Sequence, residues 1–167
     1  MKIMNQLINF FWTICGCSIL IIHWYYLWNI WWFSSSILLS FSILIFQLKH
    51  LRFSKNRKFY EGFGIRIMMK FVQNGNLINN LIRKKKPYYN IINVSNYKNY
   101  LKTINMYERF HWIMAVFFFI STVYALINGQ YIISITLILN NIWYNFYPIM
   151  LQQYNRLRIL ALKSAVL

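Results

Sequence analysis

The chain has 167 residues, of which 59% are hydrophobic, 20% are aromatic and only 12% are charged. Soluble globular domains carry roughly twice that share of charged residues, and disordered chains need low hydrophobicity, so the composition argues against both classes. Eighteen basic residues against two acidic ones give a formal net charge of +16. The two acids, Glu61 and Glu108, are too few for paired-carboxylate hydrolysis or an acidic Ca²⁺ or Mg²⁺ site.

A long uncharged stretch in the first third of the chain predicts two membrane-spanning helices. Residues 7–48 contain no Lys, Arg, Asp or Glu, and one spanning helix needs about 20 apolar residues. We expect helices over about residues 5–26 and 33–48. The turn between them is predicted near Asn29 to Ser36, where Trp and Tyr residues gather as they do at the headgroup level of a membrane.

A second uncharged stretch predicts another helical hairpin. Residues 112–153 also contain no charged side chain, and Asn128-Gly129-Gln130 divides them near the middle. Gly beside Asn is typical of a turn. We therefore expect helices over about residues 111–127 and 131–149.

The basic residues indicate how these helices are oriented. Lys2 precedes the first helix, fourteen basic residues lie in the segment of about residues 49–110, three follow the fourth helix, and the short turns carry none. Because positively charged loops stay cytoplasmic, both termini are predicted in the cytoplasm. The sequence thus predicts an all-α membrane protein, a single membrane domain of residues 1–167. It has four transmembrane helices in two hairpins, plus cytoplasmic amphipathic helices.

Basic residues beside aromatic ones can also bind nucleic acid. Here the charge separates so cleanly around the apolar stretches that the membrane alone explains it, and we expect no nucleic-acid partner. The run Arg83 to Lys86 is expected to lie on anionic lipid headgroups. Phe59, Phe63, Ile67 and Phe71 recur at helical spacing with basic residues between them, which predicts an amphipathic helix in the headgroup plane.

Glu108 and His111 are the residues best suited to chemistry. They are three positions apart and share one helix face, at the predicted cytoplasmic end of the third spanning helix. A carboxylate beside an imidazole orients the ring and raises its basicity, which suits removal of a proton from a hydroxyl nucleophile. One His and one Glu are too few to hold a metal ion, so we expect no metal site.

The fourth spanning helix carries a polar stripe: Asn141, Asn145, Pro148, Gln152 and Arg156, at steps of four, three, four and four. Polar groups in a bilayer usually face the bundle interior or a cavity. In a hairpin centred on Gly129, residues equally far from the turn lie at the same depth. The residues expected to converge on Glu108 and His111 are Asn145, Gln152, Asn155 and Arg156.

The same residues permit a structural interpretation. Glu108 can pair with Arg156 while the amides bond between helices, because structural ion-pair networks also gather ionisable groups. This gives a second hypothesis, a non-catalytic membrane subunit or assembly protein held by a Glu-His-Arg clasp. A third is a membrane-anchored basic surface that binds lipid or RNA.

Two segments resemble a known family. Residues 107–112, Y-E-R-F-H-W, and residues 145–159, N-F-Y-P-I-M-L-Q-Q-Y-N-R-L-R-I, are similar to the glycosyl-4,4'-diaponeurosporenoate acyltransferase family. Residues 60–66, Y-E-G-F-G-I-R, resemble it more loosely. The family comprises small bacterial membrane proteins associated with the last step of staphyloxanthin-type carotenoid synthesis.

The resemblance implies an acyltransferase of the bacterial cell membrane. A fatty acyl group would pass from an acyl thioester co-substrate to a sugar hydroxyl of a glycosylated carotenoid or similar glycolipid, with no cofactor and with membrane lipids as surroundings. The Glu-x-x-His pair of the family matches Glu108 and His111. We hypothesise His111 as general base, Glu108 as its orienter, and Asn155 or Arg156 as stabilisers of the oxyanion. The family's Q-R-Y-N-R is Q-Q-Y-N-R here, so Gln153 removes a cation from beside the expected site. The family's polar tail signature matches the expected substrate-binding residues Asn145, Gln152, Tyr154, Asn155, Arg156 and Arg158. Glu61 is the further substrate-binding candidate, expected either to line the entry or to be a solvated surface residue.

Overall fold

The computed structural model describes residues 2–71 and 97–164. Within these ranges the chain is helical and contains no strand, as predicted. The predicted lipid-binding run at residues 83–86 lies outside the described residues. The elements are α1 (Lys2–Tyr26), α2 (Ile30–Phe41), the 3₁₀ helix η1 (Ser42–Ile45), α3 (Arg57–Gly62), α4 (Ile65–Phe71), α6 (Tyr97–Ile127), α7 (Tyr131–Asn141), the π-helical segment η3 (Ile142–Phe146) and α8 (Tyr147–Ser164).

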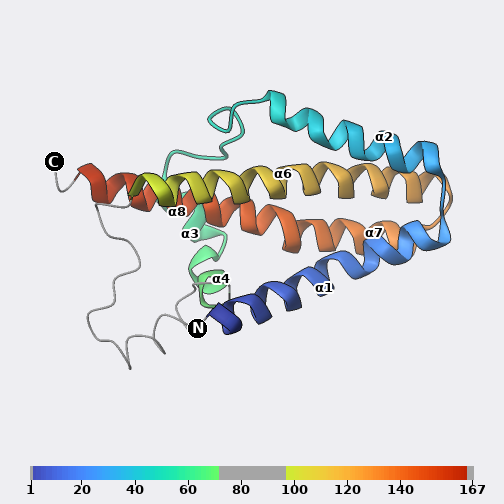
Figure 1. The fold of residues 1–167 in the computed structure, drawn as a ribbon, viewed down its shortest axis with the longest axis horizontal. Helices are drawn as coiled ribbons and strands as arrows, with labels where there is room; N and C mark the ends of the chain where they lie inside the picture. Colours follow the sequence, from blue (N-terminus) through green and yellow to red (C-terminus); the bar gives the residue numbers. More distant parts are fainter. Residues whose placement is uncertain (1, 72–96, 165–167) are drawn as a thin grey trace.

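The bundle is organised around α6 (Figure 1). Helix α7, segment η3 and helix α8 follow one another as a single rod that runs antiparallel to α6. Helix α2 packs on α6, and α1 packs mainly on α7, while α3 and α4 lie against α8. The start of α1 and the end of α8 point toward one end of the bundle, and both short turns lie at the other end.

The turn predicted at Asn128-Gly129-Gln130 is confirmed. Helix α6 ends at Ile127 and α7 begins at Tyr131. Gly129 has φ +69°, a left-handed conformation that glycine adopts without steric cost. The predicted spanning segment 111–127 is the C-terminal part of a longer helix, α6, which begins at Tyr97. The helical spacing of Leu101, Ile104, Glu108 and His111 indicates this upstream continuation in the sequence.

The turn predicted at Asn29 to Ser36 is wrong in position. The helical segment begins at Ile30 and ends at Ile45, three residues earlier at each end than the predicted 33–48. The Asn29 side-chain oxygen accepts hydrogen bonds from two backbone N–H groups of α2, at 3.0 and 3.2 Å, and such a cap starts a helix. Ser36 fits inside the helix because its hydroxyl donates to a backbone carbonyl one turn earlier.

The predicted amphipathic helix is two short helices rather than one. Gly64, at φ +72°, separates α3 from α4 and turns the chain between them. Tyr60 and Ile65 are the fully buried residues of this segment, and they pack against Leu151 and Tyr154 of α8. The predicted apolar face is exposed instead: Phe59, Phe63 and Ile67.

Apolar side chains cover much of the outer surface of the bundle. Of the described helices, only α6 is both long and apolar enough to cross a membrane, and Phe10–Tyr26 and Ile30–Ile45 are shorter apolar helical stretches. Trp31 and Ile132 are more than four-fifths exposed, at 81% and 83%. Exposed apolar surface of this kind marks contact with lipid or with another protein. The four-span arrangement therefore stays a prediction.

A close contact joins α1 to the rod of α7 and η3. The Gly16 carbonyl accepts a hydrogen bond of 2.7 Å from the Asn140 side-chain amide. A Cβ atom at Gly16 would lie 2.2 Å from the Tyr144 ring. Small residues let membrane helices approach closely, so Gly16 sets the distance between α1 and η3.

We predict that Gly16→Ala lowers stability by about 1–3 kcal/mol, because the added methyl group overpacks the contact with Tyr144. The measurement is thermal unfolding of the protein in detergent micelles. Gly62→Ala is the matched control, since a Cβ there meets nothing within 4 Å. Equal stability of the two variants would contradict the close approach of α1.

Candidate functional site

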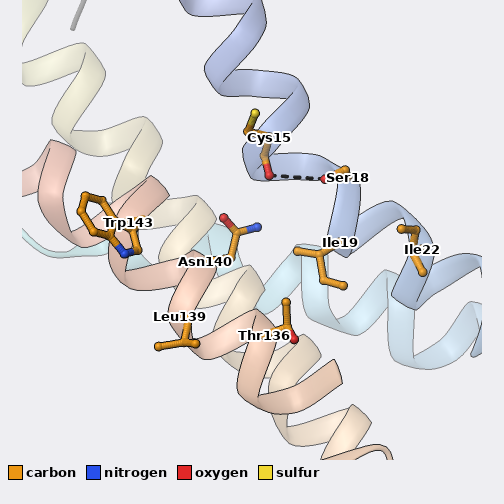
Figure 2. Close-up of a pocket in the computed structure, with 8 residues that line it drawn as sticks. All are labelled: Cys15, Ser18, Ile19, Ile22, Thr136, Leu139, Asn140 and Trp143. Carbon is orange, nitrogen blue, oxygen red and sulfur yellow. Dashed lines mark hydrogen bonds between the residues drawn. The ribbon is translucent and has the colours of Figure 1, made fainter. Parts of the chain in front are cut away.

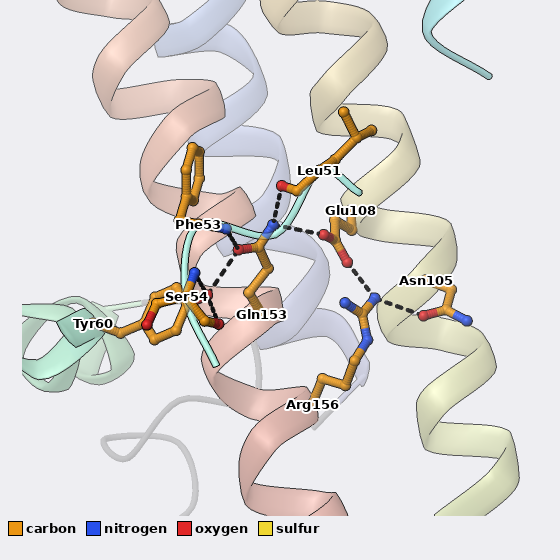
Figure 3. A network of polar contacts seen from close by, with 8 residues as sticks. All are labelled: Leu51, Phe53, Ser54, Tyr60, Asn105, Glu108, Gln153 and Arg156. Atoms are coloured by element: carbon orange, nitrogen blue, oxygen red, sulfur yellow. Dashed lines mark hydrogen bonds and ion pairs between the residues drawn. The ribbon is translucent and has the colours of Figure 1, made fainter. Parts of the chain in front are cut away.

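A buried ion pair links α6 to α8. Glu108 is 0% exposed and Arg156 is 4% exposed. The Arg156 Nη2 group donates to Glu108 Oε2 and, at 2.7 Å, to Asn105 Oδ1 (Figure 3). A carboxylate removed from water is tolerable only with a cation and hydrogen bonds around it. The predicted meeting of Glu108 with Arg156 is confirmed.

Gln153 completes the surroundings of Glu108 (Figure 3). Its amide nitrogen donates to Glu108 Oε1 at 2.8 Å and to the Leu51 carbonyl at 3.0 Å. Its amide oxygen accepts from the Phe53 backbone N–H at 3.0 Å and from the Tyr60 hydroxyl at 2.9 Å. Both donor hydrogens and both acceptor positions are thus used. Gln153 therefore ties the loop before α3, and α3 itself, to the buried carboxylate.

Gln153 occupies the place beside Glu108 that was predicted for Gln152. The π-helical segment Ile142–Phe146 has a wider turn than an α-helix, which shifts the face of all later residues. Gln153 is 2% exposed, whereas Gln152 and Asn155 are half-buried. Within the described residues, no hydrogen bond joins Gln152 or Asn155 to Glu108 or His111. The sequence offered one signal for this role: Gln153 is a second polar residue directly after Gln152 of the predicted polar stripe.

His111 lies beside Asn145 rather than bonded to Glu108. Its Nδ1 atom is 3.4 Å from Asn145 Oδ1, and its ring centroid is 5.9 Å from that of Tyr144. The two carboxylate oxygens of Glu108 accept hydrogen bonds from Gln153 and Arg156 instead. Glu108 and His111 thus share one face of α6, as predicted, but the residue that contacts the His111 ring nitrogen is Asn145 and not Glu108.

A chain of amides leads from the α6 backbone to His111. Asn141 Nδ2 donates to the Ala115 carbonyl at 3.1 Å, and Asn145 Nδ2 donates to Asn141 Oδ1 at 2.8 Å. With the amides oriented in this way, Asn145 presents its carbonyl oxygen to His111. A carbonyl oxygen only accepts, so Nδ1 carries the proton in the neutral ring. The other nitrogen, Nε2, is then the one that can accept a proton.

Glu61, Tyr154 and Arg158 gather at a second place, where α3 and α4 lie on α8. The Tyr154 hydroxyl donates to Glu61 Oε1 at 3.0 Å, and Arg66 pairs with the same oxygen at 2.9 Å. These hydrogen bonds from Arg66 and Tyr154 lower the pKa of Glu61. The Arg158 guanidinium lies 5.9 Å from the centre of the Tyr154 ring. The predicted substrate-binding residues thus divide into two groups.

An open groove of about 480 Å³ lies between α1 and α7 (Figure 2). Ile19, Leu139 and Trp143 give it apolar walls, and Asn140 lies between them. The described residues contain no group of three or more His, Cys, Asp or Glu that could hold a metal ion.

The model of the glycosyl-4,4'-diaponeurosporenoate acyltransferase family matches residues 45–165. The match includes α3, α4, α6, α7 and α8, and so every side chain of the networks around Glu108 and His111. Neither curated proteins nor solved structures gave a match.

We predict that Arg156→Met lowers the free energy of unfolding by about 3–5 kcal/mol, because Glu108 is left buried and unpaired. Adding Glu108→Gln to Arg156→Met should recover a large part of this loss. Arg158→Met removes the same charge from a side chain that forms no ion pair with any described residue, and it should cost far less. Chemical denaturation in detergent measures all three. A loss no larger for Arg156→Met than for Arg158→Met would show that the buried pair does not hold α6 and α8 together.

Proposed function

Because this chain belongs to the glycosyl-4,4'-diaponeurosporenoate acyltransferase family, we propose that it is an integral-membrane acyltransferase. It moves a fatty acyl group from a thioester donor to a sugar hydroxyl of a glycosylated carotenoid or similar glycolipid. The structural observation that carries the proposal is the chain of amides leading to His111. Polar side chains in an apolar helix are costly and are usually retained for function.

His111 is the general base of the proposed reaction. Its Nε2 atom takes the proton of the sugar hydroxyl as the hydroxyl oxygen attacks the thioester carbonyl carbon. The new C–O bond forms, the C–S bond breaks, and the proton passes to the departing thiolate. Asn145, at 3.4 Å from Nδ1, holds the ring in the tautomer that this step requires.

Arg156 is the proposed stabiliser of the tetrahedral oxyanion. Its Nη1 group is buried and, among the described residues, has no hydrogen-bond partner, while Nη2 is held by Glu108 and Asn105. A preorganised N–H donor in a site that excludes water stabilises developing negative charge strongly. Glu108 then orients Arg156 rather than His111, and Gln153 orients Glu108.

The long apolar part of the acceptor enters from the bilayer. The groove between α1 and α7 has apolar walls, and Tyr144 contacts both Gly16 of α1 and the His111 ring. An acceptor lying along this side of the bundle keeps its apolar chain in lipid while its sugar reaches the charged end of α6.

The Glu108–Arg156 pair also supports a second candidate function. An ion pair whose two carboxylate oxygens each accept a hydrogen bond suits a structural clasp. In that case the protein is a non-catalytic membrane subunit or assembly protein, and His111 is dispensable for acyl transfer.

We predict that His111→Ala lowers kcat by about 10²–10⁴-fold, the usual contribution of a general base. The measurement is the initial rate of acylated glycolipid formation by the purified protein in lipid vesicles. His50→Ala, at an exposed loop position, is the matched control and should keep the rate. An unchanged rate in His111→Ala, as in the control, would contradict the role of His111 as general base and favour the second candidate function, the structural clasp.

We also predict that both termini face the cytoplasm. A reporter fused after Leu167 and a second inserted at Asn128 to Gln130 should report opposite sides of the membrane, because the basic residues keep their end inside. Cysteine accessibility in intact cells gives an independent measurement. Reporters on the same side would contradict the proposed topology.

A further inference from the structure

A cationic pocket opens where the loop before α3 meets α3 and α4. It is open to solvent and has a volume of about 650 Å³. Four basic side chains and one acidic side chain give it a net charge of +3. The residues of this α3–α4 pocket are Lys55, Asn56, Arg57, Lys58, Glu61 and Arg66.

The chain has no carboxylate to neutralise this charge. Its only acids are Glu61 and Glu108. Glu108 is buried against Arg156 at another place, and Glu61 is already held by Arg66 and Tyr154. Among the residues that the structure describes, these two ion pairs are the only ones. Three exposed cations gathered in one concavity raise the local concentration of anions and bind phosphate groups.

The pocket adjoins the proposed reaction site through two tyrosines. Tyr60, next to Glu61 in the chain, is fully buried, and its hydroxyl contacts Gln153, which holds Glu108. Tyr154 points its hydroxyl to Glu61, on the pocket side. A ligand in the α3–α4 pocket is therefore separated from the buried network by one layer of side chains.

We infer that the α3–α4 pocket binds the phosphate groups of the acyl donor through Lys55, Arg57 and Lys58. The inference rests on the proposed function and adds a chemical class to it, a thioester that carries a phosphorylated nucleotide. The same phosphate chemistry occurs in phospholipid headgroups, and the exposed Phe59 and Phe63 lie in the same segment. The experiment therefore has one arm for each source.

The first arm measures binding of adenosine 3′,5′-bisphosphate to the full chain in nanodiscs of phosphatidylcholine, a neutral lipid. The variant Lys55→Gln/Arg57→Gln/Lys58→Gln should bind at least about tenfold more weakly, as expected from losing charge-assisted hydrogen bonds. The matched control, Lys98→Gln/Lys102→Gln/Arg109→Gln, removes two lysines and one arginine from exposed positions of α6 and should bind like the unmodified chain. With a nucleotide-bearing thioester as donor, the pocket variant should raise KM by a similar factor at unchanged kcat.

The second arm measures binding of the chain to vesicles with and without phosphatidylglycerol, an anionic lipid. If only the anionic vesicles distinguish the pocket variant from its control, the assignment to the donor is overturned in favour of a lipid headgroup. If neither probe distinguishes them, the phosphate site itself is overturned. Bisphosphate binding needs no turnover, so an unmodified chain that binds it but transfers no acyl group would contradict the proposed function and leave the phosphate site standing.

Discussion

The buried ion pair between Glu108 and Arg156 is the constraint on which the charged end of the bundle depends. In a chain with eighteen bases and two acids, one acid is placed where water cannot reach it. Its charge must be met by Arg156 and Gln153, and this requirement fixes the rotation of α8 against α6. Because Gln153 also binds the loop at Leu51, the same carboxylate positions the chain that leads into α3.

Two layers of different chemistry follow from this arrangement. Asn141, Asn145 and His111 form a neutral polar chain beside apolar helices. Three residues away along α6, about 4.5 Å, the ion pair begins the charged layer. Helices α3 and α4, which carry exposed cations, pack against α8. An apolar acceptor from the bilayer and an anionic donor from water meet most easily at such a boundary, so the proposed reaction needs no deep aqueous cavity.

Much of this arrangement could be predicted from the sequence because it follows from local rules. Gly129 defined a turn, and counting residues away from that turn placed Arg156 of α8 within about two helical turns of Glu108 of α6. The turn of the first hairpin was predicted about three residues too late because Asn29 caps the start of α2. The prediction of which α8 residues face α6 was wrong because the π-helical segment before α8 has no clear sequence signature. Gln152 was therefore expected where Gln153 lies. Gln153 stands where the family has an arginine, and the structure explains why an amide suffices there. The charge of Glu108 is already balanced by Arg156, so Gln153 needs only to donate a hydrogen bond.

The most direct measurement for the central claim is mass spectrometry of pigments from cells that make the glycosylated carotenoid, with and without this chain. Acyl transfer predicts a new pigment, heavier than the glycoside by one fatty acid less one water, only when the chain is present. An unchanged pigment profile, with the protein folded in the membrane, would contradict the claim that it is an acyltransferase.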